Sequence, residues 1–338
     1  MAGRLVADGV FEGGGVKGIG LVGALSALES RGFTWCNLAG TSAGAIVASL
    51  LASGYTAGEL KRIIGELDYM KFQDASAVGR IPLAGPLISF LTSKSLYKGD
   101  YFEKWLRGLL REKGVGTFRD LKKKDDDGTS FRFKLNVITS DITTERLVVL
   151  PSDLARYGLE PDDFDVARAV RMSMSIPFFF RPQKVAGSLF VDGGILSNFP
   201  IWLFDAPARP RWPTFGFKLV GPESDEPQPS RRLFDFSRAI FDTMKNAHDR
   251  MTVEDADMER TISIPTVGVK TTEFDLSPEK RDALFKSGLD AASRFLESYD
   301  FDRYVSNAEK RHEEPYRRRI ERARGSIGLE TLAWGRRW

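Results

Sequence analysis

The sequence predicts an α/β fold, because short apolar strands alternate with glycine-rich turns and helices. An apolar strand at residues 5–11 runs through a glycine-rich turn into a helix at residues 16–31. A second strand at residues 34–40 runs through another glycine turn into a helix at residues 43–53. This repetition is typical of α/β proteins. With 338 residues the chain is long enough for one large α/β domain or for a domain with an appendage.

Composition excludes several classes of protein. The hydrophobic fraction of 42% and the charged fraction of 28% are ordinary for a soluble globular protein. A net charge of +3 is too small to favour nucleic acid as a partner. The single cysteine, Cys36, excludes an internal disulfide. The sequence shows neither a secretory signal nor a run of about 18 apolar residues, so we expect a cytoplasmic protein without a membrane-spanning helix.

The first glycine turn, at residues 12–18, has the G-x-G-x-x-G spacing of a dinucleotide-binding loop. That loop needs an acidic residue about 20 positions later to bind the ribose, and residues 35–38 are Trp, Cys, Asn and Leu. A phosphate-binding P-loop needs Gly-Lys followed by Ser or Thr, whereas Lys17 is followed by Gly18 and Ile19. The sequence therefore argues against both nucleotide sites.

The same turn predicts an oxyanion hole, because the first N–H groups of a helix have no partner within that helix. The N–H groups around Gly14, Gly15 and Val16 would face a negative oxygen, and Lys17 would add positive charge nearby. A tight turn that only packs the helix on the strand is the structural alternative. The candidate oxyanion-hole residues are Gly13, Gly14, Gly15, Val16, Lys17 and Gly18.

The second glycine turn fits the G-x-S-x-G pattern of a nucleophile elbow, with Ser42 at its tip. Gly40 and Gly44 provide a tight turn and close packing of helix on strand, and Thr41 and Ala43 complete the motif. The helix that follows would direct its positive end at whatever reacts on Ser42. The pattern alone is weak, because small residues around a serine also occur at ordinary helix starts. An oxyanion turn one strand earlier strengthens it.

The next elements continue the alternation of helices and strands. A capping box at residues 56–59 predicts the start of a helix, and residues 100–113 have apolar side chains at helical spacing. Residues 131–139 alternate apolar and polar side chains. They predict a strand that pairs with residues 146–150.

Two apolar segments have more than one interpretation. Residues 83–96 are either a lid or interfacial surface, or a buried insertion, because periodicity does not separate these alternatives. Residues 178–180 are three consecutive phenylalanines, which form either core or the wall of an apolar pocket. They follow a predicted helix that Asp165 caps and Pro177 ends.

Asp192 ends a predicted strand at residues 189–192, and Gly193 and Gly194 allow the chain to turn directly after it. In open α/β sheets, sites assemble at the carboxyl ends of strands. An Asp-Gly pair is also common in ordinary turns, which is the structural alternative. Its place at a strand end makes Asp192 a candidate for the active site.

Beyond residue 207 the chain becomes proline-rich and then helical. Residues 214–220 predict a strand, and residues 233–251 and 278–296 predict helices. The tail at residues 310–338 contains nine Lys or Arg and four Glu, a net charge of +5. It is either a solvated end or a contact with anionic lipid.

A serine hydroxyl becomes a good nucleophile only when a base takes its proton. The order Ser42, Asp192, His248 matches the triad of the α/β-hydrolases. However, the elbow follows the second predicted strand, too early for that fold, and His248 lies in an apolar helical stripe. The other histidine, His312, lies in the charged tail. Asp192 is therefore the better candidate base, acting directly on Ser42 as a dyad.

Three blocks of this sequence resemble the signature blocks of the patatin-like phospholipase family, and two shorter blocks support them. The resemblance covers roughly residues 5–220. It implies a three-layer α/β/α fold with a mostly parallel central sheet. The helical patterns beyond this region predict a mostly helical C-terminal extension at residues 221–338 that packs on the domain. The signature blocks are residues 13–18, 40–44 and 192–194, and the shorter blocks are residues 173–177 and 198–200.

The resemblance also implies a Ser42–Asp192 dyad that cleaves acyl esters through an acyl-enzyme, without a metal or cofactor. Lys17 satisfies the family's preference for a basic residue in the glycine block. The implied substrate is a glycerophospholipid or another acyl ester. An acyltransferase with the same dyad and a catalytically silent lipid-binding protein are the alternatives. Residues 83–96 and the basic tail are the candidates for peripheral membrane contact, and the sequence leaves the oligomeric state open.

Overall fold

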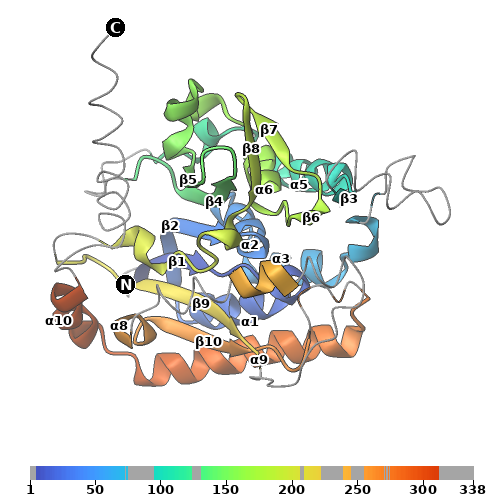
Figure 1. Cartoon of the computed structure of the whole chain (residues 1–338). Helices are drawn as coiled ribbons and strands as arrows, with labels where there is room; N and C mark the ends of the chain where they lie inside the picture. Colours follow the sequence, from blue (N-terminus) through green and yellow to red (C-terminus); the bar gives the residue numbers. More distant parts are fainter. Residues whose placement is uncertain are drawn as a thin grey trace, which may run out of the picture.

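A computed structural model describes ten parts of the chain. Within them, a mostly parallel sheet of eight strands is flanked by helices, so the prediction of an α/β fold with such a sheet is confirmed (Figure 1). The described residues are 5–72, 74, 95–123, 131–205, 209–221, 239–244, 255–269, 271, 273 and 275–311.

Five neighbouring strands of the sheet run parallel, in the order β10-β9-β1-β2-β4. Beyond them, β5 and β8 each pair antiparallel with β4, and β7 pairs antiparallel with β8. The strands are β1 (Leu5–Phe11), β2 (Phe33–Thr41), β4 (Leu135–Asp141), β5 (Arg146–Leu150), β7 (Gln183–Val185), β8 (Ser188–Asp192), β9 (Thr214–Val220) and β10 (Thr261–Pro265). A separate parallel pair joins β3 (Ser95–Tyr97) to β6 (Phe178–Phe180).

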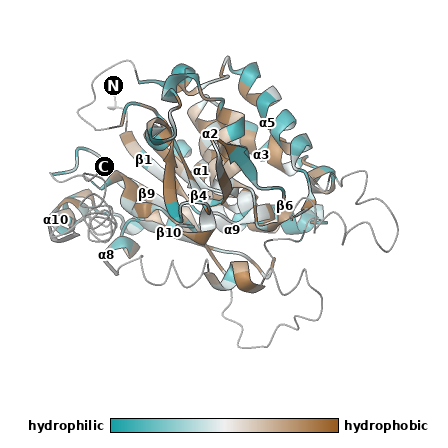
Figure 2. Cartoon of the chain, turned by 45° about the horizontal axis from the view of Figure 1, so that its top comes forward, coloured by the Kyte–Doolittle hydropathy of each residue, from teal (hydrophilic) through white to brown (hydrophobic). Residues whose placement is uncertain are grey.

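Most of the α-helices cover one face of the sheet, where their buried side chains join those of the strands in one core. On the opposite face a smaller core forms beneath the 3₁₀ helix η8 (Ile201–Phe204). Figure 2 shows hydrophobic residues along the strands and hydrophilic residues on the outer side of α5. The α-helices are α1 (Gly18–Ser30), α2 (Ala43–Ala52), α3 (Ala57–Gly65), α5 (Asp100–Glu112), α6 (Val166–Ser173), α8 (Asp255–Met258), α9 (Pro278–Ser298) and α10 (Phe301–Arg311).

Local capping signals predict the helix starts correctly. The Thr56 hydroxyl accepts a hydrogen bond from the Glu59 N–H, and the Glu59 carboxylate accepts one from the Thr56 N–H, which completes the capping box of α3. The Asp165 carboxylate caps α6. Ser277 caps α9 immediately before a proline. In each case the capping side chain satisfies an N–H group that the helix itself leaves without a partner.

The predicted strand at residues 131–139 is wrong at its start, because β4 begins only at Leu135. The preceding residues pair with residues 121–123: the Lys134 N–H donates to the Leu121 carbonyl, and the Lys123 N–H donates to the Arg132 carbonyl. An alternating pattern does not distinguish this local pairing from a place in the sheet. The helix predicted from residue 16 also begins later, since the 3₁₀ helix η1 (Gly15–Lys17) precedes α1.

The chain beyond residue 220 contributes to the same sheet and to the layer that covers it. Strand β10 pairs with β9, and α9 lies along α1 (Figure 1). The two helices are close enough that a Cβ at Gly23 would clash with the Phe285 carbonyl oxygen and a Cβ at Gly288 with the Gly20 carbonyl oxygen. The division of the chain into a catalytic domain at residues 5–220 and a mostly helical extension at residues 221–338 stays a prediction.

Several sequence-based interpretations fall on residues outside the described part. These are the apolar residues 83–94, the helix predicted over residues 233–251 apart from the helical residues 239–244, and the basic tail beyond residue 311. Of the helices that are described, none is long and apolar enough to cross a membrane.

Candidate active site

Ser42 lies between β2 and α2 in a strained backbone conformation, with φ of 53° and ψ of −121°. L-residues rarely adopt this conformation, and when they do it is often at functional sites. The two flanking glycines permit the turn. A Cβ at Gly40 would clash with the backbone of Gly44, and a Cβ at Gly44 would clash with the Phe11 carbonyl oxygen. The turn therefore has the geometry of a nucleophile elbow.

We expect Gly44→Ala to destabilise the fold by about 1–3 kcal/mol or more, because the new methyl group must displace the end of β1. Gly108→Ala is the matched control, since Gly108 lies in the exposed middle of α5, where a new methyl group would meet no neighbouring element within 4 Å. That variant should gain about 1 kcal/mol from higher helix propensity. Urea unfolding of both variants measures the difference. A Gly44→Ala variant as stable as wild type would contradict the described elbow.

The strand ends that carry Ser42 and Asp192 are adjacent, because β2 and β8 pair with the same edge of β4. Residues 137–141 of β4 pair with β5. The same stretch of β4 pairs with β2 up to residue 138 and with β8 from residue 139, so β2 and β8 both lie on the edge opposite β5. Strand β2 ends with Thr41 opposite Ile138, and β8 arrives from the opposite direction and ends with Asp192 opposite Thr139. The carboxyl ends of β2 and β8 therefore meet at consecutive positions of β4.

The Asp192 carboxylate is fully buried, and its Oδ1 accepts a hydrogen bond of 2.8 Å from the Gly194 N–H. Gly193 is needed at the meeting point of the strands, because a Cβ there would clash with the Ile138 carbonyl oxygen. The Asp-Gly-Gly motif thus places an acid at the end of β8 and lets the chain turn directly after it.

The glycine loop lies directly beside the elbow. A Cβ at Gly13 would be 3.2 Å from the Ser42 Cβ. Among the described residues, the N–H groups of Gly14 and Gly15 have no hydrogen-bond partner. The Val16 N–H, by contrast, donates to the Thr271 carbonyl at 3.2 Å. Of the predicted oxyanion donors, the Gly14 and Gly15 N–H groups are therefore available, whereas the Val16 N–H is bonded to Thr271.

Two side chains that sequence reasoning did not assign to the site fix the glycine loop. Asn198 donates from Nδ2 to Glu12 Oε1 at 2.9 Å and to the Gly13 carbonyl at 3.2 Å. The backbone carbonyl of Asn198 accepts a hydrogen bond from the Gly13 N–H at 3.1 Å. The buried Glu12 also accepts from the Leu219 N–H through Oε2. An acid before a glycine block and an Asn-Phe-Pro segment were the only signals in the sequence.

A third unassigned side chain, Ser173, joins the elbow to the sheet. The Ser42 N–H donates to Ser173 Oγ at 2.9 Å, and Ser173 Oγ donates to the Ile138 carbonyl at 2.6 Å. The hydroxyl therefore bridges the point where β2 leaves β4.

Neither histidine can be placed, because His248 and His312 lie outside the described residues. The hydrolase triad is accordingly not tested by the structure. Within the part of the chain that is described, no group of three or more His, Cys, Asp or Glu could hold a metal ion.

Comparison with known proteins agrees with this fold. The patatin-like phospholipase model matches residues 9–205. The chain is 44% identical over 300 residues to the uncharacterized protein YqhO of Bacillus subtilis, covering 87% of this chain and 99% of that protein. It is 26% identical over 192 residues to the probable lipid hydrolase 463L of Invertebrate iridescent virus 6, covering 57% of this chain and 61% of that protein. Among solved structures, VipD from Legionella pneumophila has a TM-score of 0.52 at 21% identity, over 87% of this chain and 67% of that one, a likeness of fold.

The fold and the elbow place this chain among the α/β proteins built around a serine at a strand-to-helix turn. Within that class, the chain belongs to the patatin-like phospholipase family. The family match and the lipid-hydrolase relative support lipid hydrolase activity.

Proposed function

We propose that this protein hydrolyses acyl esters of glycerolipids with Ser42 as nucleophile and Asp192 as base. The observation that supports the proposal is that β2 and β8 end at consecutive positions on one edge of β4, with Ser42 directly after β2 and the buried Asp192 at the end of β8. A carboxylate can serve as the general base for a serine hydroxyl within its reach.

In the first step, Ser42 Oγ attacks the acyl carbonyl carbon while the Asp192 carboxylate takes the hydroxyl proton. The tetrahedral intermediate carries a negative oxygen, for which the N–H groups of Gly14 and Gly15 are the donors. Asp192 returns the proton to the departing alcohol oxygen, which leaves an acyl ester on Ser42. Water then attacks this ester while Asp192 takes its proton. As the bond to Ser42 Oγ breaks, Asp192 returns that proton to Ser42 Oγ and the fatty acid leaves.

The surroundings favour negative charge at the reacting oxygen. Helix α2 begins at Ala43, directly after the candidate nucleophile, and α1 begins immediately after the glycine loop. Both helices therefore present the positive ends of their dipoles to the site. Lys17 lies in the short helix between the loop and α1 and adds a cation to this region.

Two alternatives use the same residues differently. An acyltransferase would pass the acyl group from Ser42 to an alcohol, and a silent lipid-binding protein would form no acyl-enzyme. Peripheral membrane contact belongs to the proposal because glycerophospholipids lie in a bilayer. Its candidate segments, residues 83–96 and the basic tail, rest on the sequence alone.

Product analysis tests the proposal. Vesicles of phosphatidylcholine with a labelled acyl chain are incubated with the full chain, with and without glycerol as acceptor. We expect labelled fatty acid and lysolipid as the main products in both reactions. Labelled glycerol ester as the main product would favour the acyltransferase. If no fatty acid is released from any of several phospholipids that differ in head group, the proposed function is wrong.

A further inference from the structure

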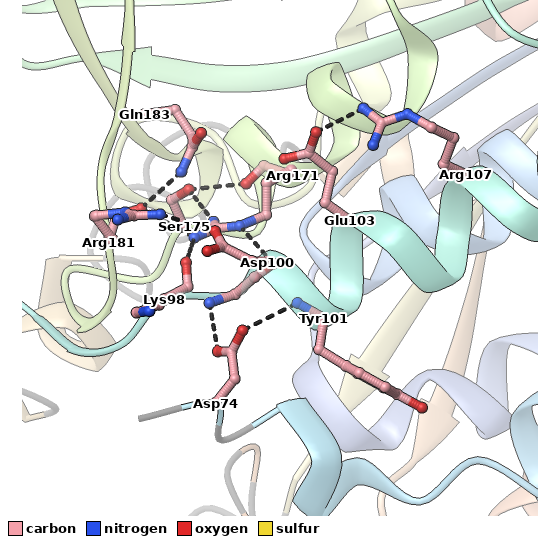
Figure 3. Close-up of polar contacts among 11 residues, drawn as sticks. Asp74, Lys98, Asp100, Tyr101, Glu103, Arg107, Arg171, Ser175, Arg181 and Gln183 are labelled. Atoms are coloured by element: carbon pink, nitrogen blue, oxygen red, sulfur yellow. Dashed lines mark hydrogen bonds and ion pairs between the residues drawn. The ribbon is translucent and has the colours of Figure 1, made fainter. Parts of the chain in front are cut away.

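Arg171, in α6, is among the largest side chains that are fully buried, and its guanidinium collects four oxygen acceptors (Figure 3). Nη1 donates to Ser175 Oγ at 2.6 Å, and Nε donates to the Gly99 carbonyl at 3.1 Å. Nη2 donates to the Arg181 carbonyl at 3.1 Å and to the Lys98 carbonyl. No carboxylate bonds directly to this cation among the described residues, so it is held by carbonyls and one hydroxyl.

Such a cation is costly to bury, because removing it from water is only partly offset by neutral acceptors. Desolvation lowers the pKa of Arg171 to about 10, against the opposing influence of Glu103, Asp100 and other carboxylates nearby. The backbone is also adapted to it. Gly99 has φ of 73°, and a Cβ there would lie 2.5 Å from the guanidinium. An apolar side chain here would leave three carbonyls and the Ser175 hydroxyl without this donor, so the arrangement of the chain around Arg171 depends on its guanidinium.

The guanidinium bonds to the residues that directly follow two parallel strands. Strands β3 and β6 pair with each other, and Lys98 and Arg181, which give two of the four acceptors, directly follow them. The guanidinium also lies over the Phe180 ring, 5.5 Å from its centroid. On the other side, the Asp74 carboxylate accepts from the Gly99 N–H at 2.6 Å and fixes the start of α5 (Figure 3).

The fourth acceptor leads to the active site. Ser175 Oγ accepts from Arg171 and donates to the Arg171 carbonyl at 2.8 Å, and the Ser175 carbonyl accepts from the Asp192 N–H at 2.9 Å. Two residues earlier, Ser173 Oγ accepts from the Ser42 N–H. A three-residue segment therefore holds the backbone of both candidate catalytic residues, and Arg171 holds that segment.

We propose that Arg171 is a positioning residue for the Ser42–Asp192 pair, acting through Ser175 rather than on substrate. This inference rests on the proposed function. Its physical basis is that a misplacement of about 1 Å, even from a change far from the chemistry, can lower turnover by about 10²-fold. Lysine cannot replace the arginine, because one ammonium group does not span four acceptors in the fixed geometry of a guanidinium.

Two variants with a matched control test this role. Arg171→Lys keeps the charge, and Ser175→Ala removes the hydroxyl while sparing the three carbonyl contacts. Arg260→Lys is the control, because Arg260 is equally buried but pairs with Asp205 and Asp257. We expect Arg171→Lys and Ser175→Ala to lower kcat by about 10- to 100-fold. Their KM should stay within about twofold, as expected for a loss confined to the transition state. Arg260→Lys should keep wild-type kcat.

Hydrogen exchange gives a second readout that does not depend on activity. In Arg171→Lys and Ser175→Ala, peptides containing the Ser42 and Asp192 amides should exchange at least about tenfold faster than in wild type, because their acceptors are no longer held. Arg260→Lys should leave these peptides unchanged. Wild-type kcat and exchange in both test variants would overturn the inference. If Arg171→Lys does not fold, Ser175→Ala alone decides. A wild-type chain without hydrolysis would refute the proposed function, and exchange would still decide the positioning role.

Discussion

Replacing Ser42 by alanine is expected to lower fatty-acid release by about 10⁶-fold, the scale seen when a serine hydrolase loses its nucleophile. Alanine fits the elbow as well as serine does, since the backbone strain and the N–H bond to Ser173 do not involve the Ser42 hydroxyl. The loss should therefore appear in kcat and leave unfolding unchanged. Release of labelled fatty acid from phosphatidylcholine vesicles measures it.

A nearby serine provides the control for that experiment. Ser49 is fully buried in α2, and its hydroxyl donates to the Ile46 carbonyl within the same helix. Ser49→Ala should keep turnover within about twofold, because such intrahelical bonds contribute little to structure or site. A Ser42→Ala variant that is folded and as active as Ser49→Ala would show that another residue is the nucleophile.

Asp192→Asn is expected to lower turnover by about 10⁴-fold, comparable to the loss of the acid in a serine protease triad. The amide oxygen can still accept from the Gly194 N–H, so the fold should persist. The amide cannot take a proton from Ser42, and the nucleophile then has no base. Steady-state hydrolysis, with unfolding as a control for stability, measures the change.

His248→Ala separates the dyad from the triad. Because the dyad needs no histidine, the turnover of His248→Ala should stay within a few-fold of wild type after correction for any loss of stability. A fall of about 10⁴-fold in His248→Ala would identify a triad instead.

Patterns local in sequence predicted most of the secondary structure. The strand at residues 5–11 and the helix starts at Thr56, Asp165 and residue 278 are confirmed, because each depends on neighbours within a few positions. The error at residue 131 has the same origin. An alternating segment can pair with a neighbouring turn as well as with a sheet, and only the fold decides which.

Such local patterns did not predict the direction of β8 in the sheet. The sequence placed Asp192 at a strand end, where sites of parallel sheets assemble. The structure delivers it from an antiparallel strand that meets β2 end to end. Strand direction depends on how the chain crosses between β4 and β8, and no local composition records this.

The supports of the site are likewise non-local. Glu12 is bonded to Asn198 and to Leu219, and the Val16 N–H is bonded to Thr271, all far apart in the chain. Arg171 lies at an ordinary position of a helix, where arginine is usually exposed. Its burial became evident only when β3, β6 and the start of α5 were seen around it.

Mapping a covalent adduct determines whether Ser42 is the nucleophile. The wild-type chain is treated with a fluorophosphonate, digested and sequenced by mass spectrometry, in parallel with Ser42→Ala and Ser49→Ala. We expect a single adduct on Ser42 in wild type and in Ser49→Ala, together with loss of hydrolysis, and no adduct in Ser42→Ala. An adduct on another residue, or hydrolysis that persists with Ser42 fully modified, would contradict the claim.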